Sequence, residues 1–276
     1  MNYTIKMDTT YWHKQGDKPL YEELLWSKPE NKRFAGKLLI VGGNAHGFLA
    51  PASAFGIAEK TGIGVAKVLL PDVVSKSVGQ VLENTEYAPS NKSGSFAKNA
   101  LEQWLHFASW ADGILLAGDF GHNSETAVVI EKFLKMYSGP VIVTQDAIDE
   151  LYSAPSNLLD RPSTVIVASL GQLQRLCTEI KYKTAIKYEY TLQQMVSLLQ
   201  QLTAEYKATI IVKHNNIFLV AADGKVSSTH SDSSESIWRV ETAATASVWV
   251  IQNPSKQFEA ATTSIYEVIN NQKNQN

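Results

Sequence analysis

The sequence predicts a three-layer, doubly wound α/β domain with a mainly parallel sheet and helices on both of its faces. Two observations predict this fold: short β-branched apolar runs recur along the chain, and segments with helical spacing separate them. Most of the runs are apolar on both faces, which is typical of strands that helices cover on both sides. The alternation favours βαβ units with right-handed crossovers.

Seven runs are predicted to be strands because they are short, β-branched and bounded by turn residues. They are Lys37–Gly42, Val65–Pro71, Gly113–Gly118, Pro140–Gln145, Thr164–Ser169, Thr209–His214 and Ile217–Ala222. The last run is expected to form a hairpin with the run before it, so that the sheet is mixed at one edge.

Four segments have the apolar spacing of amphipathic helices, and a fifth begins with small residues and becomes helical. They are Ala52–Thr61, Phe96–Trp110, Ser124–Tyr137, Leu192–Tyr206 and Thr242–Ile251. The single cysteine, Cys177, lies in an apolar-periodic run and is expected to be a buried small hydrophobe; one cysteine excludes an intramolecular disulfide.

Composition favours one globular domain over residues 1–276, with an N-terminal extension over 1–27 and a frayed tail over 270–276. Apolar residues make up 44% of the chain and charged residues 19%, which excludes a disordered or fibrous protein. The net charge of −2 provides no basic stripe for nucleic acid. The first residues lack the apolar centre of a signal peptide, and no apolar run would span a membrane, so we expect a cytoplasmic protein. We expect no metal site of its own, because His and acidic residues do not recur at a metal-like spacing.

Three loops at predicted strand ends are candidate ligand sites, because ligands of such sheets bind beyond the carboxyl ends of the strands. Gly42–Gly47 could bring backbone amides and a helix N-terminus to an anion, or could be a plain tight turn. In Ala117–His122, Asp119 could face a cation or a ribose, or could cap a helix. Asp146, within Thr144–Ala147, is open to the same two interpretations.

A fourth candidate, Thr242–Val248, is a string of very small residues that leads into a helix. Small residues let the backbone wrap around an anion at a helix N-terminus. Close packing of a helix on the sheet would also require small residues, so both interpretations stay open.

Taken in order, these segments resemble the ADP/ATP-dependent NAD(P)H-hydrate dehydratases, a carbohydrate-kinase-like family of the ribokinase-like superfamily. The resemblance runs roughly from residue 28 to residue 251. It is strongest in Phe34–Asn44 (FAGKLLIVGGN) and continues in Ala58–Val65 (AEKTGIGV). Shorter matches follow at Ala111–Gly121, Thr144–Ala147, Gly171 and Lys213.

The resemblance implies a ribokinase-like fold and the repair of hydrated nicotinamide cofactors. The family phosphorylates the misplaced hydroxyl with ADP or ATP and Mg²⁺, and loss of the phosphate restores the double bond. It further implies a nucleotide or dinucleotide as partner, and a homo-oligomer. Substrate contacts are expected at Gly43, Asn44, Asp119, Gly121 and Asp146. Nucleotide or phosphate contacts are expected at Lys213, Thr242, Ala243, Ala244, Thr245 and Ala246.

The chain departs from the family in its loops while its strands keep the pattern. Ser247 stands where the family's Gly-Thr-Gly-Asp loop has the Asp that takes the proton from the hydroxyl, and a serine is a poor proton acceptor at neutral pH. Further replacements affect the family's glycines and its His-Pro-Gly-Glu turn. They are Ala243, Ala244, Ala246, Gly118-Asp119, Ser169–Gln172 and His214. Together these changes predict a divergent member with lost or strongly reduced catalysis.

Three alternatives remain. The chain could be an active hydrate dehydratase that uses a displaced acid such as Glu241, or a sugar or vitamin kinase on the same fold. It could also be a non-enzymatic nucleotide-binding or assembly protein, in which Ile237–Arg239 would be suspected as a contact surface.

Overall fold

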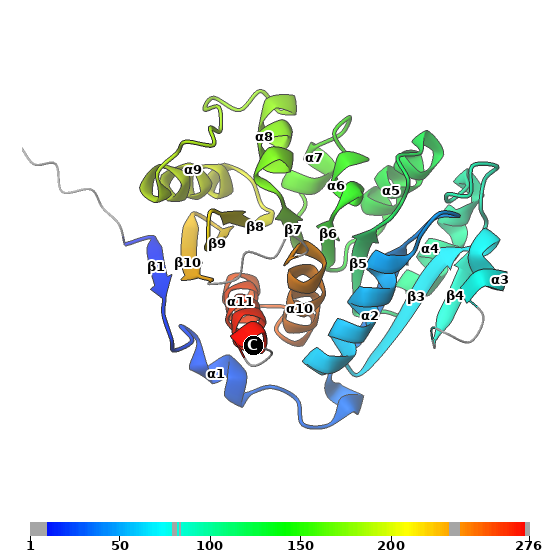
Figure 1. Cartoon of the computed structure of the whole chain (residues 1–276), viewed down its shortest axis with the longest axis horizontal. Helices are drawn as coiled ribbons and strands as arrows, with labels where there is room; N and C mark the ends of the chain where they lie inside the picture. The colour runs from blue at the N-terminus through cyan, green and yellow to red at the C-terminus, as the bar shows by residue number, and fades with distance from the viewer. Residues whose placement is uncertain (1–9, 79–81, 83, 232–237, 274–276) are drawn as a thin grey trace, which may run out of the picture.

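The computed structural model describes residues 10–78, 82, 84–231 and 238–273. Within these residues, ten strands form one sheet in the order β1-β10-β9-β8-β7-β6-β5-β2-β3-β4 (Figure 1). The strands are β1 (Trp12–Gln15), β2 (Lys37–Gly42), β3 (Val65–Pro71), β4 (Thr85–Ala88), β5 (Gly113–Gly118), β6 (Val141–Thr144), β7 (Thr164–Ala168), β8 (Thr209–His214), β9 (Ile217–Ala222) and β10 (Lys225–His230).

The α-helices follow the strands and range from one turn to more than four turns in length. They are α1 (Glu22–Trp26), α2 (Leu49–Thr61), α3 (Ser75–Val78), α4 (Leu101–Ala108), α5 (Ser124–Met136), α6 (Asp146–Asp149), α7 (Ser156–Leu159), α8 (Leu170–Glu179), α9 (Leu192–Glu205), α10 (Trp238–Gln252) and α11 (Gln257–Lys273). Short 3₁₀ turns precede β2 (Lys32–Phe34), follow β3 (Asp72–Val74) and precede α4 (Lys98–Ala100).

Most strand pairs are parallel, and the predicted hairpin is present at β8 and β9. Their antiparallel register pairs Lys213 with Phe218. β10 then continues the antiparallel edge, and β1 joins β10 in parallel. The mixed edge predicted from the sequence is therefore confirmed, and it is wider than one hairpin.

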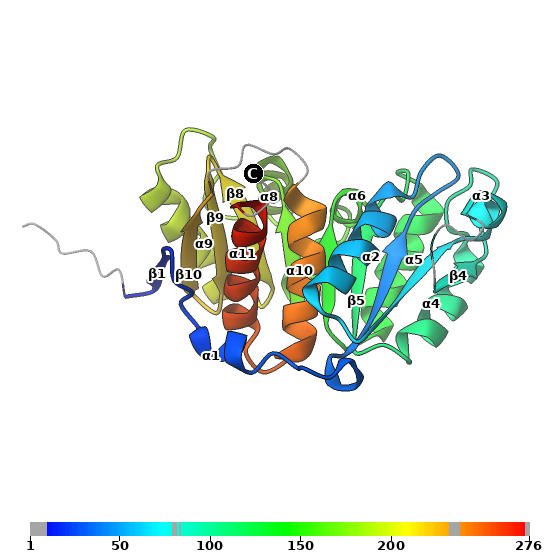
Figure 2. The same ribbon diagram turned by 60° about the horizontal axis from the view of Figure 1, so that its bottom comes forward.

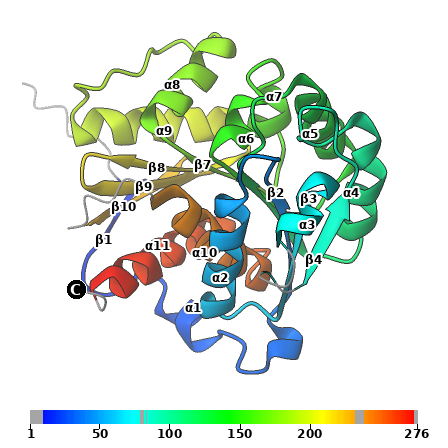
Figure 3. The ribbon, with the colours of Figure 1, turned by 45° about the vertical axis from the view of Figure 1, so that its right-hand side comes forward.

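Helices cover both faces of the sheet, so the predicted three-layer α/β fold is confirmed. Helices α2, α10 and α11 cover one face, and α4 to α9 cover the other (Figure 3). The two hydrophobic cores match this arrangement: Trp249 of α10 belongs to one, whereas Trp104 of α4 belongs to the other. The central strands contribute to both cores, which explains why their sequences are apolar on both faces.

The predicted strands and helices agree with the structure where the apolar pattern is strong, and the polar elements were missed. The elements without a prediction are β1, β4, β10, α1, α3, α6, α7, α8 and α11. Helix α11 extends to Lys273, so the prediction that fraying begins at Asn270 is wrong for 270–273, and residues 274–276 lie outside the described residues. Cys177 is buried as predicted, and burial raises the pKa of its thiol to about 12.

No helix among the described residues is both long enough and apolar enough to cross a membrane.

Candidate functional site

The carboxyl ends of β2 and β5 meet in a turn that has space only for glycine. A Cβ atom on Gly42 would overlap the carbonyl oxygen of Gly118. That oxygen accepts a hydrogen bond from the backbone N–H of Gly43 at 3.0 Å, and Gly43 has a φ of 86°. The glycines predicted from the sequence are thus required by the close approach of two backbones.

Asn44 joins the loop after β2 to the loop after β5. Its side chain is buried, its Nδ2 donates to the carbonyl oxygen of Asp119 at 2.6 Å, and its Oδ1 accepts from the backbone N–H of His46 at 2.7 Å. The amide is therefore held by the protein itself, and its first role is to position the two loops.

Asp119 caps a helix, although not the one that follows it. Its Oδ2 accepts from the backbone N–H of Ala50 at 2.8 Å, in the first turn of α2. The residue that precedes α2, Phe48, has no side-chain cap of its own. The helix that follows Asp119, α5, is capped instead by Asn123. Of the two interpretations given above for Asp119, the capping role is the one with a geometric basis.

The two carboxylate oxygens of Asp146 differ in their hydrogen bonds. Its Oδ2 accepts from the backbone N–H of Gly121 at 3.1 Å, whereas its Oδ1 is buried without a partner among the described residues. Burial is the main cause that raises the pKa of this carboxyl above its usual range, and the backbone N–H groups of Gly121 and Phe120 both lower it. The hydrogen bond to Gly121 joins Asp146 to the loop after β5. The bond from Asn44 to Asp119 joins that loop to the turn at Gly43.

Glu150 is an acid of this region that the sequence did not single out. Its Oε1 accepts from the backbone N–H of Asn123 at 3.1 Å and lies 3.9 Å from Nδ1 of His122. Desolvation raises its pKa to about 7, and His122 acts in the opposite direction. No sequence motif includes Glu150. It reaches Asn123 in the β5–α5 loop only because α6, which ends just before it, packs beside that loop.

The predicted phosphate loop is wrong in its placement, because Thr242–Ala246 lie inside α10. The helix already includes Trp238, and all five residues are buried in it. Inside a helix the backbone N–H groups bind the carbonyl four residues earlier, so these residues cannot form a nest for an anion. Their small side chains instead let α10 pack closely on β5 and β6, the interpretation left open above.

Ser247 is fully buried near the middle of α10. Its hydroxyl donates to the carbonyl oxygen of Ala243 at 2.7 Å. Ser247 therefore lies about two and a half helical turns from Trp238, the first described residue of α10. The family's Asp is expected at the amino-terminal end of the helix, here called the mouth of α10, and Ser247 is not there.

Two other residues singled out in the sequence, Lys213 and Glu241, lie close to the first described turn of α10. Nζ of Lys213, at the end of β8, lies 5.1 Å from the centre of the Phe218 ring, and the edge of that ring contacts Trp238 at 5.4 Å between centroids. Glu241 accepts from Nε2 of Gln272 in α11 at 2.9 Å. Of the suspected contact surface, Ile237 lies outside the described residues, and Trp238 is packed against Phe218.

Helices α6 and α8 and the first described turn of α10 lie at the same end of the sheet (Figure 2). Polar side chains of these three helices contact one another. Nη1 of Arg239 donates to Oε1 of Gln172 at 2.7 Å, and Nε2 of Gln172 donates to Oδ1 of Asp149 at 2.9 Å. Gln172 is the last residue of the turn that replaces the family's His-Pro-Gly-Glu. Among the described residues, no group of three or more His, Cys, Asp or Glu is arranged to hold a metal ion.

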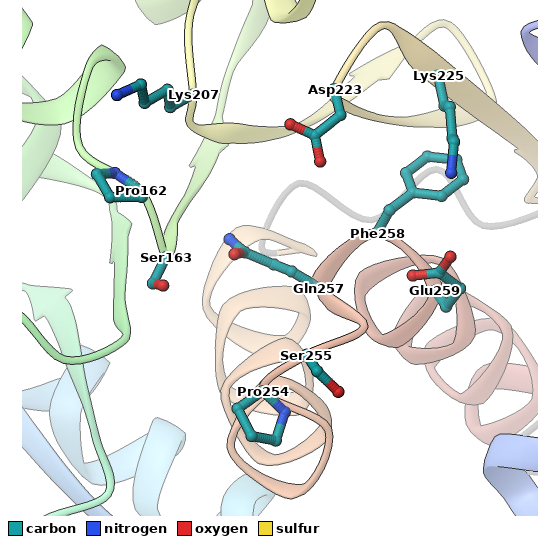
Figure 4. A pocket seen from close by; sticks show the side chains of 10 residues that line it. All are labelled: Pro162, Ser163, Lys207, Asp223, Lys225, Pro254, Ser255, Gln257, Phe258 and Glu259. Carbon is teal, nitrogen blue, oxygen red and sulfur yellow. The ribbon is translucent and has the colours of Figure 1, made fainter.

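A pocket of about 550 Å³ opens at the opposite, amino-terminal edge of the sheet (Figure 4). Two lysines and two acids line it together with uncharged residues. The charged residues are Lys207, Asp223, Lys225 and Glu259. None of the residues predicted to contact a ligand lines this pocket, and its formal charges cancel, so the carboxyl edge remains the candidate site.

The chain is similar to proteins of known structure over nearly its whole length. It matches a ribokinase-like superfamily protein of Enterococcus faecalis with a TM-score of 0.71 and 14% identity, over 98% of this chain and 90% of that one. It matches the ADP/ATP-dependent NAD(P)H-hydrate dehydratase of Bacillus subtilis, co-crystallised with ATP and Mg²⁺, with a TM-score of 0.60 and 14% identity, over 91% and 87%.

These likenesses show that the chain has a ribokinase-like fold. A curated relative agrees with the resemblance found in the sequence: the bifunctional NAD(P)H-hydrate repair enzyme of Methanocaldococcus jannaschii is 29% identical over 118 residues. That match covers 41% of this chain and only 22% of the relative's length. No protein-family model matches this chain.

Proposed function

We propose that this ribokinase-like chain is a divergent relative of the NAD(P)H-hydrate dehydratases that keeps a nucleotide-type ligand cleft at the carboxyl edge of its sheet and has lost, or strongly reduced, catalysis. The observation that supports it best is the contact of Arg239 with Gln172 at the mouth of α10. The family's anion hole is made of small residues, whereas the first described turn of α10 carries an arginine that Gln172 holds in place.

The preserved part of the cleft is the set of loops after β2, β5 and β6. Asn44 and Asp119 hold the first two loops together, and Asp146 holds the third through Gly121. Oδ1 of Asp146 is buried without a hydrogen bond among the described residues, and such an oxygen is costly. A ligand hydroxyl that donates to Oδ1 would remove that cost, as expected for a ribose or a hydrated nicotinamide ring.

The proposed loss of catalysis does not rest on Ser247. That residue is buried inside α10, so its exchange for Asp would not by itself supply or remove a base at the mouth. Two acids, Asp232 and Glu235, precede α10 in the sequence but lie outside the described residues. They are the first positions to test for an active enzyme that uses a displaced acid.

The described residues at the mouth do not fit a Mg²⁺ ion of their own. Asp149 is the acid nearest to the contact, but its Oδ1 already accepts from Gln172, and Tyr152 hydrogen-bonds the same carboxylate. The guanidinium of Arg239 beside it repels a cation. Mg²⁺ would therefore have to arrive on the phosphates of a nucleotide.

The experiment has two parts. Thermal unfolding is followed with ADP, ATP, NADH and NADPH; a ligand at 100 times its Kd adds ~2.7 kcal/mol of stability, so binding will appear as a raised Tm. The chain is then incubated with hydrated NADH and ADP or ATP, and formation of NADH is followed by absorbance. We expect a raised Tm with at least one nucleotide and little or no turnover.

Turnover at the rate of an active hydrate dehydratase would contradict the proposed loss of catalysis. Its disappearance in Asp232→Asn, Glu235→Gln or Asp146→Asn would then identify the acid responsible. A flat Tm with all four ligands would contradict the proposed cleft and favour a protein that acts through its surface.

A further inference from the structure

The carboxamide of Gln172 connects the ends of two strands to the mouth of α10. Its Oε1 accepts from the backbone N–H of Ser169 at 3.1 Å and from Nη1 of Arg239 at 2.7 Å. Its Nε2 donates to the carbonyl oxygen of Gln145 at 2.8 Å and to Asp149 at 2.9 Å. Four partners use the two lone pairs and both hydrogens of the amide, so its orientation is fixed.

The burial of Gln172 makes this arrangement rigid. The residue is only 8% exposed, and it also completes the capping box of α8 with Ser169. Gln145, one of its partners, has a φ of 55°, which a non-glycine residue adopts only when its surroundings hold it there. The hydrogen bonds that fix the Gln172 carboxamide therefore also fix the position of the Arg239 guanidinium.

Arg239 is a half-buried cation with a neutral hydrogen-bond partner. Among the described residues, its guanidinium bonds to the Gln172 amide and forms no ion pair within 4.0 Å. Burial lowers its pKa, and the negative charge of Asp149 acts in the opposite direction. A partly desolvated charge without a directly bonded counter-ion costs stability unless an anion binds to it.

A guanidinium is suited to a phosphate because its N–H groups match two phosphate oxygens at once. Arg239 lies in the first described turn of α10, and the dipole of a helix is positive toward its amino-terminal end. The Gln172 amide uses one face of the fork, which leaves the other N–H groups to a ligand. Phosphate binding at this place does not depend on the helix dipole alone, because the buried side chain of Gln172 holds the guanidinium of Arg239 there.

From this geometry we infer that Arg239 binds the phosphate groups of the nucleotide and takes, at the mouth of α10, the place of a protein-held Mg²⁺ ion, with Gln172 as its positioning residue. The inference rests on the proposed nucleotide cleft and adds the group that recognises the phosphates. It predicts that nucleotide affinity depends on Arg239 and not on free Mg²⁺.

The test is calorimetric titration of the full chain with ATP and with ADP, in buffer with Mg²⁺ and in buffer with EDTA. Arg239→Gln removes the charge, and Arg239→Lys keeps the charge without the fork. The matched control is Arg175→Gln: Arg175 lies 4.3 Å from the centre of the Tyr152 ring, in the neighbouring helix α8, and is mostly exposed. Circular dichroism checks that each variant is folded.

We expect Arg239→Gln to weaken ATP binding at least tenfold, Arg239→Lys to weaken it less, and Arg175→Gln to change it less than twofold. EDTA should leave the affinity of the native chain within about threefold. Should Arg239→Gln not fold, Arg239→Lys keeps the inference open to refutation, because native-like affinity in that variant contradicts recognition by the fork.

Equal affinities of Arg239→Gln and Arg175→Gln would overturn the inference and leave the cleft intact, and so would binding that EDTA abolishes. A native chain that binds neither nucleotide would overturn the inference and the proposed cleft together.

Discussion

The loops after β2 and β5 and the helix α10 were both marked in the sequence by small residues, yet the structure uses those residues in opposite ways. Gly42 and Gly43 form a turn at a strand end, where two backbones touch. Thr242–Ala246 form the buried interior of a helix. The difference is one of conformation: glycine at a strand end allows a positive φ, whereas alanine is the best helix former and readily continues a helix.

The largest effect that would test this comparison is expected from Ser247→Asp. The new carboxylate would be fully buried inside α10, so we expect a loss of several kcal/mol in the free energy of unfolding. Ser247→Ala, which removes only a hydroxyl bonded within the helix, should cost about 1 kcal/mol or less. Urea denaturation measures both.

If Ser247→Asp were as stable as the native chain and gained dehydratase turnover, Ser247 would be at the mouth of the helix after all. The placement of α10 given above would then be contradicted.

Gly42→Ala tests the glycine turn at the ends of β2 and β5. The added methyl group would overlap the carbonyl oxygen of Gly118, and we expect a loss of about 1–3 kcal/mol. The control is Gly56→Ala within α2, where no atom lies within 4 Å of the new Cβ. Since alanine favours a helix, this control should gain ~0.5–1 kcal/mol. Equal effects of the two changes would show that the turn is not tightly packed.

Asp119→Ala separates capping from ligand binding. Loss of the bond to the backbone N–H of Ala50 should cost ~1 kcal/mol, the usual value for a lost helix cap, and should leave nucleotide affinity nearly unchanged. Asp119→Asn keeps an acceptor and should cost less. Thermal melts and titration of each variant provide the two values, and lost affinity at unchanged stability would reverse the assignment.

The smallest effect concerns Glu150 and pH. Its pKa is about 7 in the folded chain against an ordinary value of 4.5, so the folded state holds the proton where the unfolded chain has released it. The contribution of Glu150 to stability is therefore highest below about pH 4.5, falls as the pH rises from 4.5 to about 7, and is constant above that. Because part of the group's surroundings is solvated, we expect an effect on the order of 1 kcal/mol.

Glu150→Gln should flatten this decline, whereas Glu131→Gln, which removes an acid of an exposed pair with Lys135, should preserve it. Denaturation curves across that pH range provide the comparison. An unchanged slope in Glu150→Gln would assign the decline to other groups.

The sequence was informative where a local pattern determines the structure. The strand Lys37–Gly42 and its glycine turn follow from β-branched residues and a positive φ, both local properties. The short edge strand β4 was missed because its four residues lack an apolar pattern and depend on pairing with β3.

The site was harder to predict, because its contacts join distant segments. Arg239 meets Gln172 over a separation of 67 residues, and Glu150 meets Asn123 through the packing of α6. The spacing of residues along the sequence does not predict contacts between segments so far apart. The start of α10 was misplaced for a related reason: a run of alanine and threonine fits a helix interior as well as a helix entrance, and only burial distinguishes them.

A crystal structure of the chain with bound ADP would test the central claim most directly. The account predicts phosphate oxygens at hydrogen-bond distance, about 2.7–2.9 Å, from the guanidinium of Arg239 at the carboxyl edge. A nucleotide seated in the pocket at the amino edge, between Lys207 and Lys225, would contradict it.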